Sequence, residues 1–253
     1  MFFNNLDGLI WLVVLLIPFN LIQKQVHKEI QTIFFLLTKN RTGAILLFSV
    51  IFLPGVFIHE ISHFMAAKLL RVRTGGFSLL PKPVGRGQLQ LGYVEITRTD
   101  WFRGSLIGVA PLMAGGSLIA YLATVQLDLS SLWGQLLNGQ SSLFWEGFLD
   151  LPERPYFWLM AYLILVVSST MMPSDSDRHA WLPLGLILLI IFTIVFIAGA
   201  GTWMIENLAP TINSLFTGLA MVIGLSGLLH ILLYLPTLGI HKILVRITGY
   251  DLR

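Results

Sequence analysis

The sequence predicts an all-α membrane protein: a polytopic bundle of about six transmembrane helices, with a small β-hairpin after the second helix. Two features of composition predict this class. Only 11% of the 253 residues are charged, whereas soluble domains average about 25%, and the mean hydropathy is +0.79. In addition, apolar runs extend from one end of the chain to the other. We therefore expect residues 1–253 to form a single membrane-embedded domain.

The first 41 residues divide into an apolar part and a mixed part. Residues 8–22 form an apolar run that is short for a membrane-crossing helix, which needs about 20 residues. Residues 23–38 mix polar and charged side chains with apolar ones. This mixture predicts either an amphipathic helix at the membrane interface or a helix that re-enters the bilayer.

Five further apolar runs complete the predicted bundle. They cover residues 42–67, 105–126, 155–172, 181–204 and 208–238. Each is separated from the next by a polar or charged segment, which we expect to lie outside the hydrocarbon layer.

The segment between the second and third predicted spans, residues 68–103, is strongly basic and differs in pattern. Residues 76–81 and 88–97 alternate in polarity and indicate two strands, with the turn at Gly85-Arg86-Gly87. Because basic loops mark the cytoplasmic side, we expect this segment to face the cytoplasm, most simply at the plasma membrane. The polar, acidic segment 127–154 is then expected to be an outer loop.

The second predicted span contains the sequence His59-Glu60-Ile61-Ser62-His63. On a helix, side chains four residues apart project from one face, so the two imidazoles can bind one Zn²⁺. The adjacent Glu60 can accept a proton from the attacking water. Ionisable groups inside a membrane span are costly and indicate a functional site.

The absence of cysteine means that histidine or carboxylate groups must supply every ligand of such a metal. A hydrolytic zinc site normally has three protein ligands. After the fourth predicted span, Pro173 breaks the helix and is followed by two aspartates, Asp175 and Asp177. Either aspartate is a candidate for the third ligand. The remaining candidates are His179, Glu95 and Asp100.

Taken together, these features resemble the site-2 protease family, whose members are intramembrane zinc metalloproteases. The features are the motif at residues 59–63 within a span, the hairpin-like segment, a third span containing glycine and proline, and an aspartate after a proline. The resemblance covers a core of residues 42–180, and the flanking spans 1–41 and 181–253 are only compatible with it. In the family's later motif, an asparagine and a proline commonly precede Leu-Asp-Gly. Here Ser168, Ser169 and Thr170 stand where that asparagine is expected.

The resemblance implies a role for each matching residue. His59, His63 and an aspartate would bind Zn²⁺, and Glu60 would act as general base. The sequence Pro173-Ser174-Asp175-Ser176-Asp177 is similar to a variant Pro-Ser-x-x-Asp form of the later motif, which selects Asp177 over Asp175. The implied substrate is a transmembrane helix of another protein, which is cleaved within or near the bilayer.

Two other function classes are consistent with the composition. One is a catalytically silent, protease-like membrane scaffold that controls a partner protein. The other is a metal transporter, although its polar residues would be expected to extend through several spans. Nucleic-acid binding is not indicated, because no basic stripe is interleaved with aromatic side chains. Nothing in the sequence indicates an oligomeric state.

Overall fold

The computed structural model describes residues 6–84, 88–174, 176–179 and 181–249, and it is predominantly helical. Within these residues, four stretches of helix are long and apolar enough to cross a membrane. They are Asp7–Thr38, Arg41–Leu69, Trp101–Gln126 and Trp181–Thr248. A fifth apolar helix, α6 (Phe157–Thr170), has only 14 residues. The predicted helical bundle is confirmed in this coarser form, but six spans are not shown.

The N-terminal segment is one continuous helix, α1 (Asp7–Thr38), rather than a short span followed by a separate interfacial piece. The structure places Phe19, Val26 and Ile33 among its buried residues. These residues are seven apart and lie on one helix face, so the apolar stripe of the first half continues through the second. The division expected near residue 22 was wrong because the polar residues of the second half do not end the helix: Gln23 and Glu29 are buried and find partners on neighbouring helices.

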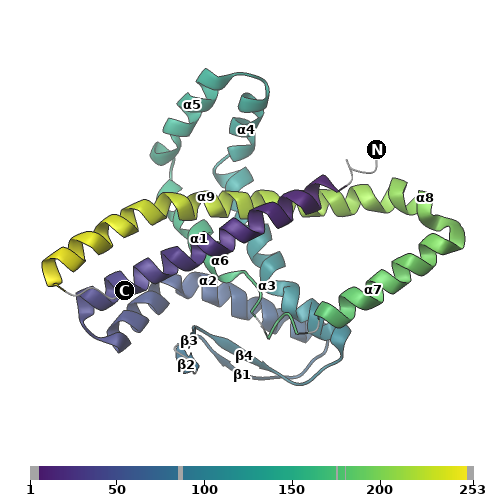
Figure 1. Ribbon diagram of the computed structural model, residues 1–253, viewed down its shortest axis with the longest axis horizontal. Helices are drawn as coiled ribbons and strands as arrows, with labels where there is room; N and C mark the ends of the chain where they lie inside the picture. Colours follow the sequence, from purple (N-terminus) through teal and green to yellow (C-terminus); the bar gives the residue numbers. More distant parts are fainter. Residues whose placement is uncertain (1–5, 85–87, 175, 180, 250–253) are drawn as a thin grey trace.

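The first and last long helices, α1 and α9 (Ala209–Thr248), pack against each other in parallel (Figure 1). Near their N-termini, the Gly8 amide donates to Asn213 Oδ1 at 2.8 Å. Toward their C-termini, Glu29 pairs with His241. Six alternating spans would place the first and last helices antiparallel, so this pairing differs from the predicted topology.

The predicted spans at 181–204 and 208–238 are parts of one bent helical stretch. It starts with α7 (Trp181–Val195) and continues through a short helix, α8 (Gly201–Trp203), into α9. The bend lies at Gly199, whose φ of 93° is in the region that favours glycine. As a result, α7 and α9 form two arms of a V at one end of the molecule (Figure 1).

Helix α2 (Arg41–Leu69) follows α1 after a tight turn and packs against both α3 (Trp101–Tyr121) and α6. Its N-terminus is capped by Asn40, whose side chain accepts a hydrogen bond from the Thr42 amide at 2.9 Å. The central core lies between these helices and α1. Its largest fully buried side chains include Phe19, Phe52, Ile119, Ile164 and Met171.

The segment after α2 forms two antiparallel strand pairs. Strand β1 (Thr74–Ser78) pairs with β4 (Tyr93–Ile96), and β2 (Lys82–Val84) pairs with β3 (Gln88–Gln90). The predicted hairpin is therefore present as an interrupted ribbon, which lies along α2 (Figure 1). Its expected turn, residues 85–87, lies outside the described residues.

The segment 127–154, expected to be an outer loop, contains helical structure. It contains two packed helices, α4 (Leu129–Leu137) and α5 (Ser141–Leu149), followed by a short helical turn at Leu151–Glu153. These helices form because apolar residues at helical spacing, such as Leu132 and Leu136, make a stripe among the polar ones. In Figure 1 the two helices project from the body of the molecule.

Candidate metal centre

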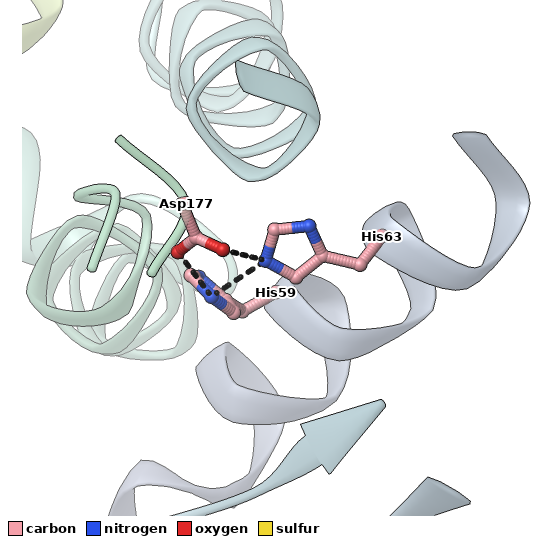
Figure 2. Close-up of side chains that lie close together, drawn as sticks. All are labelled: His59, His63 and Asp177. Atoms are coloured by element: carbon pink, nitrogen blue, oxygen red, sulfur yellow. Dashed lines mark hydrogen bonds and ion pairs between the residues drawn. The ribbon is translucent and has the colours of Figure 1, made fainter. Parts of the chain in front are cut away.

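Three side chains from two distant parts of the chain converge beside α2. His59 and His63 project from one face of this helix, and Asp177 approaches from the segment between α6 and α7 (Figure 2). The two Nε2 atoms lie 3.2 Å apart. The Asp177 Oδ1 atom lies 3.3 Å from His63 Nε2, and Oδ2 lies 4.0 Å from His59 Nε2. Two nitrogens and a carboxylate oxygen therefore face one small volume.

The other candidate third ligands do not join this group within the described residues. Glu95 accepts a hydrogen bond from the Gly76 amide at 3.0 Å, in the strand ribbon. Asp100 caps the N-terminus of α3 through the Arg103 amide, at 2.9 Å. That bond holds the pKa of Asp100 below its ordinary value. His179 does not belong to the converging group, and Asp175 lies outside the described residues.

A hydrogen bond to α3 fixes the orientation of the second histidine. The Nδ1 atom of His63 lies 2.9 Å from the backbone carbonyl oxygen of Ile107. Because a carbonyl only accepts hydrogen bonds, Nδ1 carries the proton and Nε2 presents its lone pair toward His59 and Asp177. This is the arrangement that orients histidine ligands in metal sites.

The carboxylate of Asp177 is held by its own loop. Both the amide and the hydroxyl of Ser174 donate to Oδ2, at 2.7 and 2.6 Å. Burial alone would raise the pKa of Asp177, but the neighbouring His63 ring and the hydrogen bonds from Ser174 outweigh that effect and lower it. The carboxylate is thus kept in the ionised form that a metal ligand requires.

The close approach of this loop to α3 depends on a glycine. A Cβ atom on Gly108 would overlap the backbone carbonyl of Asp177. Gly108 follows Ile107 directly, so adjacent residues of α3 contact both His63 and the Asp177 loop. Although α3 supplies no ligand, it sets the position of two of the three.

The side chain of Glu60 lines the same cavity as His59, His63 and Asp177. The cavity has a volume of about 410 Å³, and its wall includes residues from the β4 segment. Gly92 lies directly against Glu60: a Cβ at residue 92 would be 2.9 Å from Glu60 Cγ and 3.1 Å from Oε1. The side chain of Glu60 is buried, so this strand segment closes over it.

The geometry of the converging group fits a zinc ion. Zinc–ligand bonds of about 2.0–2.2 Å in a tetrahedral site place neighbouring ligand atoms about 3.3 Å apart. Two of the three separations, 3.2 and 3.3 Å, match this spacing. The donor set of two imidazoles and one carboxylate also matches known catalytic zinc sites, which leave a further position for water.

Two features in and around the site were missed by reasoning from the sequence. Gln23 and His27 of α1 also line the cavity, although this region was assigned to a flanking span. The contact of Gly108 with the Asp177 backbone has no sequence signal. The polar pair also had no distinct signal, because Gln23 and His27 lie in a stretch rich in other polar residues.

Comparison with models of protein families, with curated protein sequences and with solved structures finds no match to this chain.

Proposed function

We propose that this chain is a zinc-dependent intramembrane endopeptidase that hydrolyses a peptide bond within or near a transmembrane helix of a membrane-protein substrate. One observation carries the proposal. His59, His63 and Asp177 converge at a cavity that Glu60 also lines. His59, Glu60 and His63 belong to α2, a helix apolar enough to cross a membrane.

His59, His63 and Asp177 would hold the zinc ion. When bound, zinc supplies Lewis-acid chemistry, lowering the pKa of water and polarising the scissile carbonyl. Glu60 would accept the proton of the attacking water and later deliver it to the leaving amine. The enclosing strand segment at Gly92 and the surrounding apolar helices would limit the access of bulk water to Glu60.

The proposed substrate class follows from the surroundings of the cavity. The helices packed around it are apolar, so a substrate reaching it laterally would itself be an apolar helix in the bilayer. The resemblance to site-2 proteases supports the same substrate class. We place the protein in the plasma membrane with its active site toward the cytoplasmic side, on the strength of the basic segment 68–103.

The proposal is tested by co-expressing the wild-type protein and its Glu60→Gln variant and comparing the membrane-protein fragments that accumulate. Fragments with new termini inside or near transmembrane helices are expected with wild type and absent with Glu60→Gln. Both proteins should contain equal zinc, because the substitution removes the base and no ligand. Glu146→Gln, on the exposed surface of α5, is the matched control and should behave as wild type.

Identical fragment patterns from wild type and Glu60→Gln would contradict a catalytic role. If that result came with stoichiometric zinc, it would favour the alternative of a catalytically silent membrane scaffold. The absence of zinc from purified wild-type protein would contradict the metal assignment itself.

A further inference from the structure

Helix α1 contributes two polar side chains to the cavity that holds Glu60. Gln23 and His27 are four residues apart, so they project from the same face of the helix. Both line the cavity together with His59 and Glu60. Neither belongs to the converging group of metal-ligand candidates, so the proposed zinc chemistry gives them no role.

Gln23 is held in a defined orientation. Its Nε2 donates to the backbone carbonyl of Ser169 in α6 at 2.6 Å. Within the described part of the chain, no hydrogen bond to its Oε1 is present. The side-chain amide of Gln23 is therefore fixed in the cavity wall, with its Oε1 free to accept a hydrogen bond.

The ring of His27 makes aromatic contacts, but one of its nitrogen atoms lacks a hydrogen-bond partner among the described residues. Its ring meets Phe48 and Phe52 edge-on, with centroids 5.4 and 5.0 Å away. Its Nε2 is buried and has no hydrogen-bond partner among the described residues. An unpaired buried polar atom is destabilising, whereas a phenylalanine would keep the ring contacts without that cost. The imidazole therefore points to a partner that is absent from the chain itself.

We propose that Gln23 and His27 bind the backbone of the substrate where it unwinds next to the scissile bond. Gln23 Oε1 would accept a hydrogen bond from a peptide N–H. The His27 ring would turn its enclosed Nε2 toward the cavity and donate a hydrogen bond to a peptide carbonyl. This inference rests on the proposed function and names the groups that recognise its substrate. No covalent step is involved, and both residues are positioning residues.

The spacing of the two side chains suits an extended peptide. Four residues of α-helix rise about 6 Å, and groups on one edge of an extended chain repeat every two residues, about 6.6 Å. One edge of one unwound segment can therefore reach both side chains. In an apolar surrounding, the N–H and C=O groups freed by unwinding need such partners.

The test uses a synthetic peptide, because backbone recognition does not depend on the side chains of the substrate. The peptide has about 20 leucine and alanine residues with a central glycine segment that unwinds, lysines at both ends and a fluorophore. Binding is measured in detergent micelles with Glu60→Gln protein, and cleavage with protein that retains Glu60. The substitutions are Gln23→Leu and His27→Phe, with Gln25→Leu on the exposed face of α1 as the matched control.

We expect Gln23→Leu and His27→Phe each to raise the peptide Kd by on the order of tenfold, as the loss of one hydrogen bond predicts. Cleavage should fall by a similar factor in kcat/KM, with zinc content unchanged. His27→Gln, which keeps an N–H donor, should recover part of the loss. Gln25→Leu should match wild type.

Unchanged Kd and kcat/KM in both variants would overturn the inference. An equal loss with Gln25→Leu, or a loss accompanied by loss of zinc, would also overturn it by showing a structural effect. Absence of peptide binding to the Glu60→Gln protein would overturn it as well. Peptide binding that depends on Gln23 and His27, without any cleavage by wild type, would support the inference and contradict the proposed function.

Discussion

Pro111 stands four residues after Ile107 in α3, at the position whose backbone N–H would otherwise bond to the Ile107 carbonyl. Proline has no N–H, so this carbonyl lacks its regular helical donor. It instead accepts the hydrogen bond from Nδ1 of His63 at 2.9 Å. Pro111 thus leaves the Ile107 carbonyl of α3 free to accept the hydrogen bond that orients His63 on α2.

Replacing Pro111 by alanine should weaken zinc binding without weakening the helix. The new N–H of residue 111 would compete with His63 for the Ile107 carbonyl. Loss of such a supporting bond typically costs about 10- to 100-fold in metal affinity, and we expect a value near the lower end because the competition is partial. At the same time, α3 gains a backbone hydrogen bond that stabilises it.

The measurement is competition for zinc against a chromophoric chelator, together with thermal unfolding in EDTA. Pro236→Ala, inside α9 and outside the cavity, is the control and should leave zinc affinity unchanged. Equal zinc affinities for Pro111→Ala and wild type would show that Pro111 does not serve the site.

Gly108→Ala should disrupt the site more severely. The added methyl group would overlap the backbone carbonyl of Asp177, and a backbone atom cannot turn away as a flexible side chain can. We expect the Asp177 loop to shift and zinc affinity to fall by on the order of 100-fold, as for loss of a ligand's support.

Gly116→Ala is a matched control for Gly108→Ala in the same helix. Its Cβ would meet only a Leu219 side-chain atom, at the ordinary contact distance of 3.7 Å. Zinc titration of both purified variants distinguishes a local effect on the site from a general effect of alanine in α3. Similar affinities for the two variants would refute the role assigned to Gly108.

The sequence predicted the parts of the site that depend on local spacing or on a motif. His59 and His63 required only the four-residue repeat of a helix. The proline break left Asp175 and Asp177 open, and the resemblance to the later motif selected Asp177. The contributions of Ile107, Gly108 and α1 could not be predicted, because they depend on how α1, α2 and α3 approach one another in space. Helix packing in an apolar bundle is set by small residues and shape, which leave little periodic signal.

The fold, too, was predictable from the sequence only in part. The presence of two long helices near residues 42–67 and 105–126 followed from apolar runs of sufficient length and was confirmed, although both begin earlier in the structure, at Arg41 and Trp101. The division of α1 was wrong because polar residues within it, such as Gln23 and Glu29, were interpreted as the end of a membrane span. The parallel packing of α1 and α9 depends on the bend at Gly199, which the apolar composition of that stretch does not indicate.

Ser174→Ala should lower zinc affinity by about 10- to 100-fold while all proposed ligands remain. The substitution removes the hydroxyl that donates to Asp177 Oδ2 at 2.6 Å. It keeps the hydrogen bond from the Ser174 backbone N–H to the same oxygen. With less support, the carboxylate samples more orientations and binds the metal less well.

The control for Ser174→Ala is Ser176→Ala in the same loop. The Ser176 hydroxyl contacts the Ser174 hydroxyl at 2.7 Å, so its removal should have a smaller effect. Isothermal titration with zinc at fixed pH compares the two variants. A larger loss for Ser176→Ala than for Ser174→Ala would require a different account of how Asp177 is held.

Gly92→Ala should separate hydrolysis from metal binding. Its Cβ would lie 2.9 Å from both Glu60 Cγ and Val56 Cγ1. Val56 is β-branched and stiff, so the strain falls on the more flexible glutamate. Displacing a general base removes a contribution of about 10²- to 10⁴-fold, and we expect kcat to fall by at least about tenfold with zinc content unchanged.

Cleavage of the glycine-centred peptide and zinc content are measured on the same preparation. The control is Gly134→Ala, whose Cβ meets nothing within 4 Å. Wild-type kcat in Gly92→Ala would show that the strand segment does not fix Glu60, whereas loss of zinc would show that it supports the metal ligands instead.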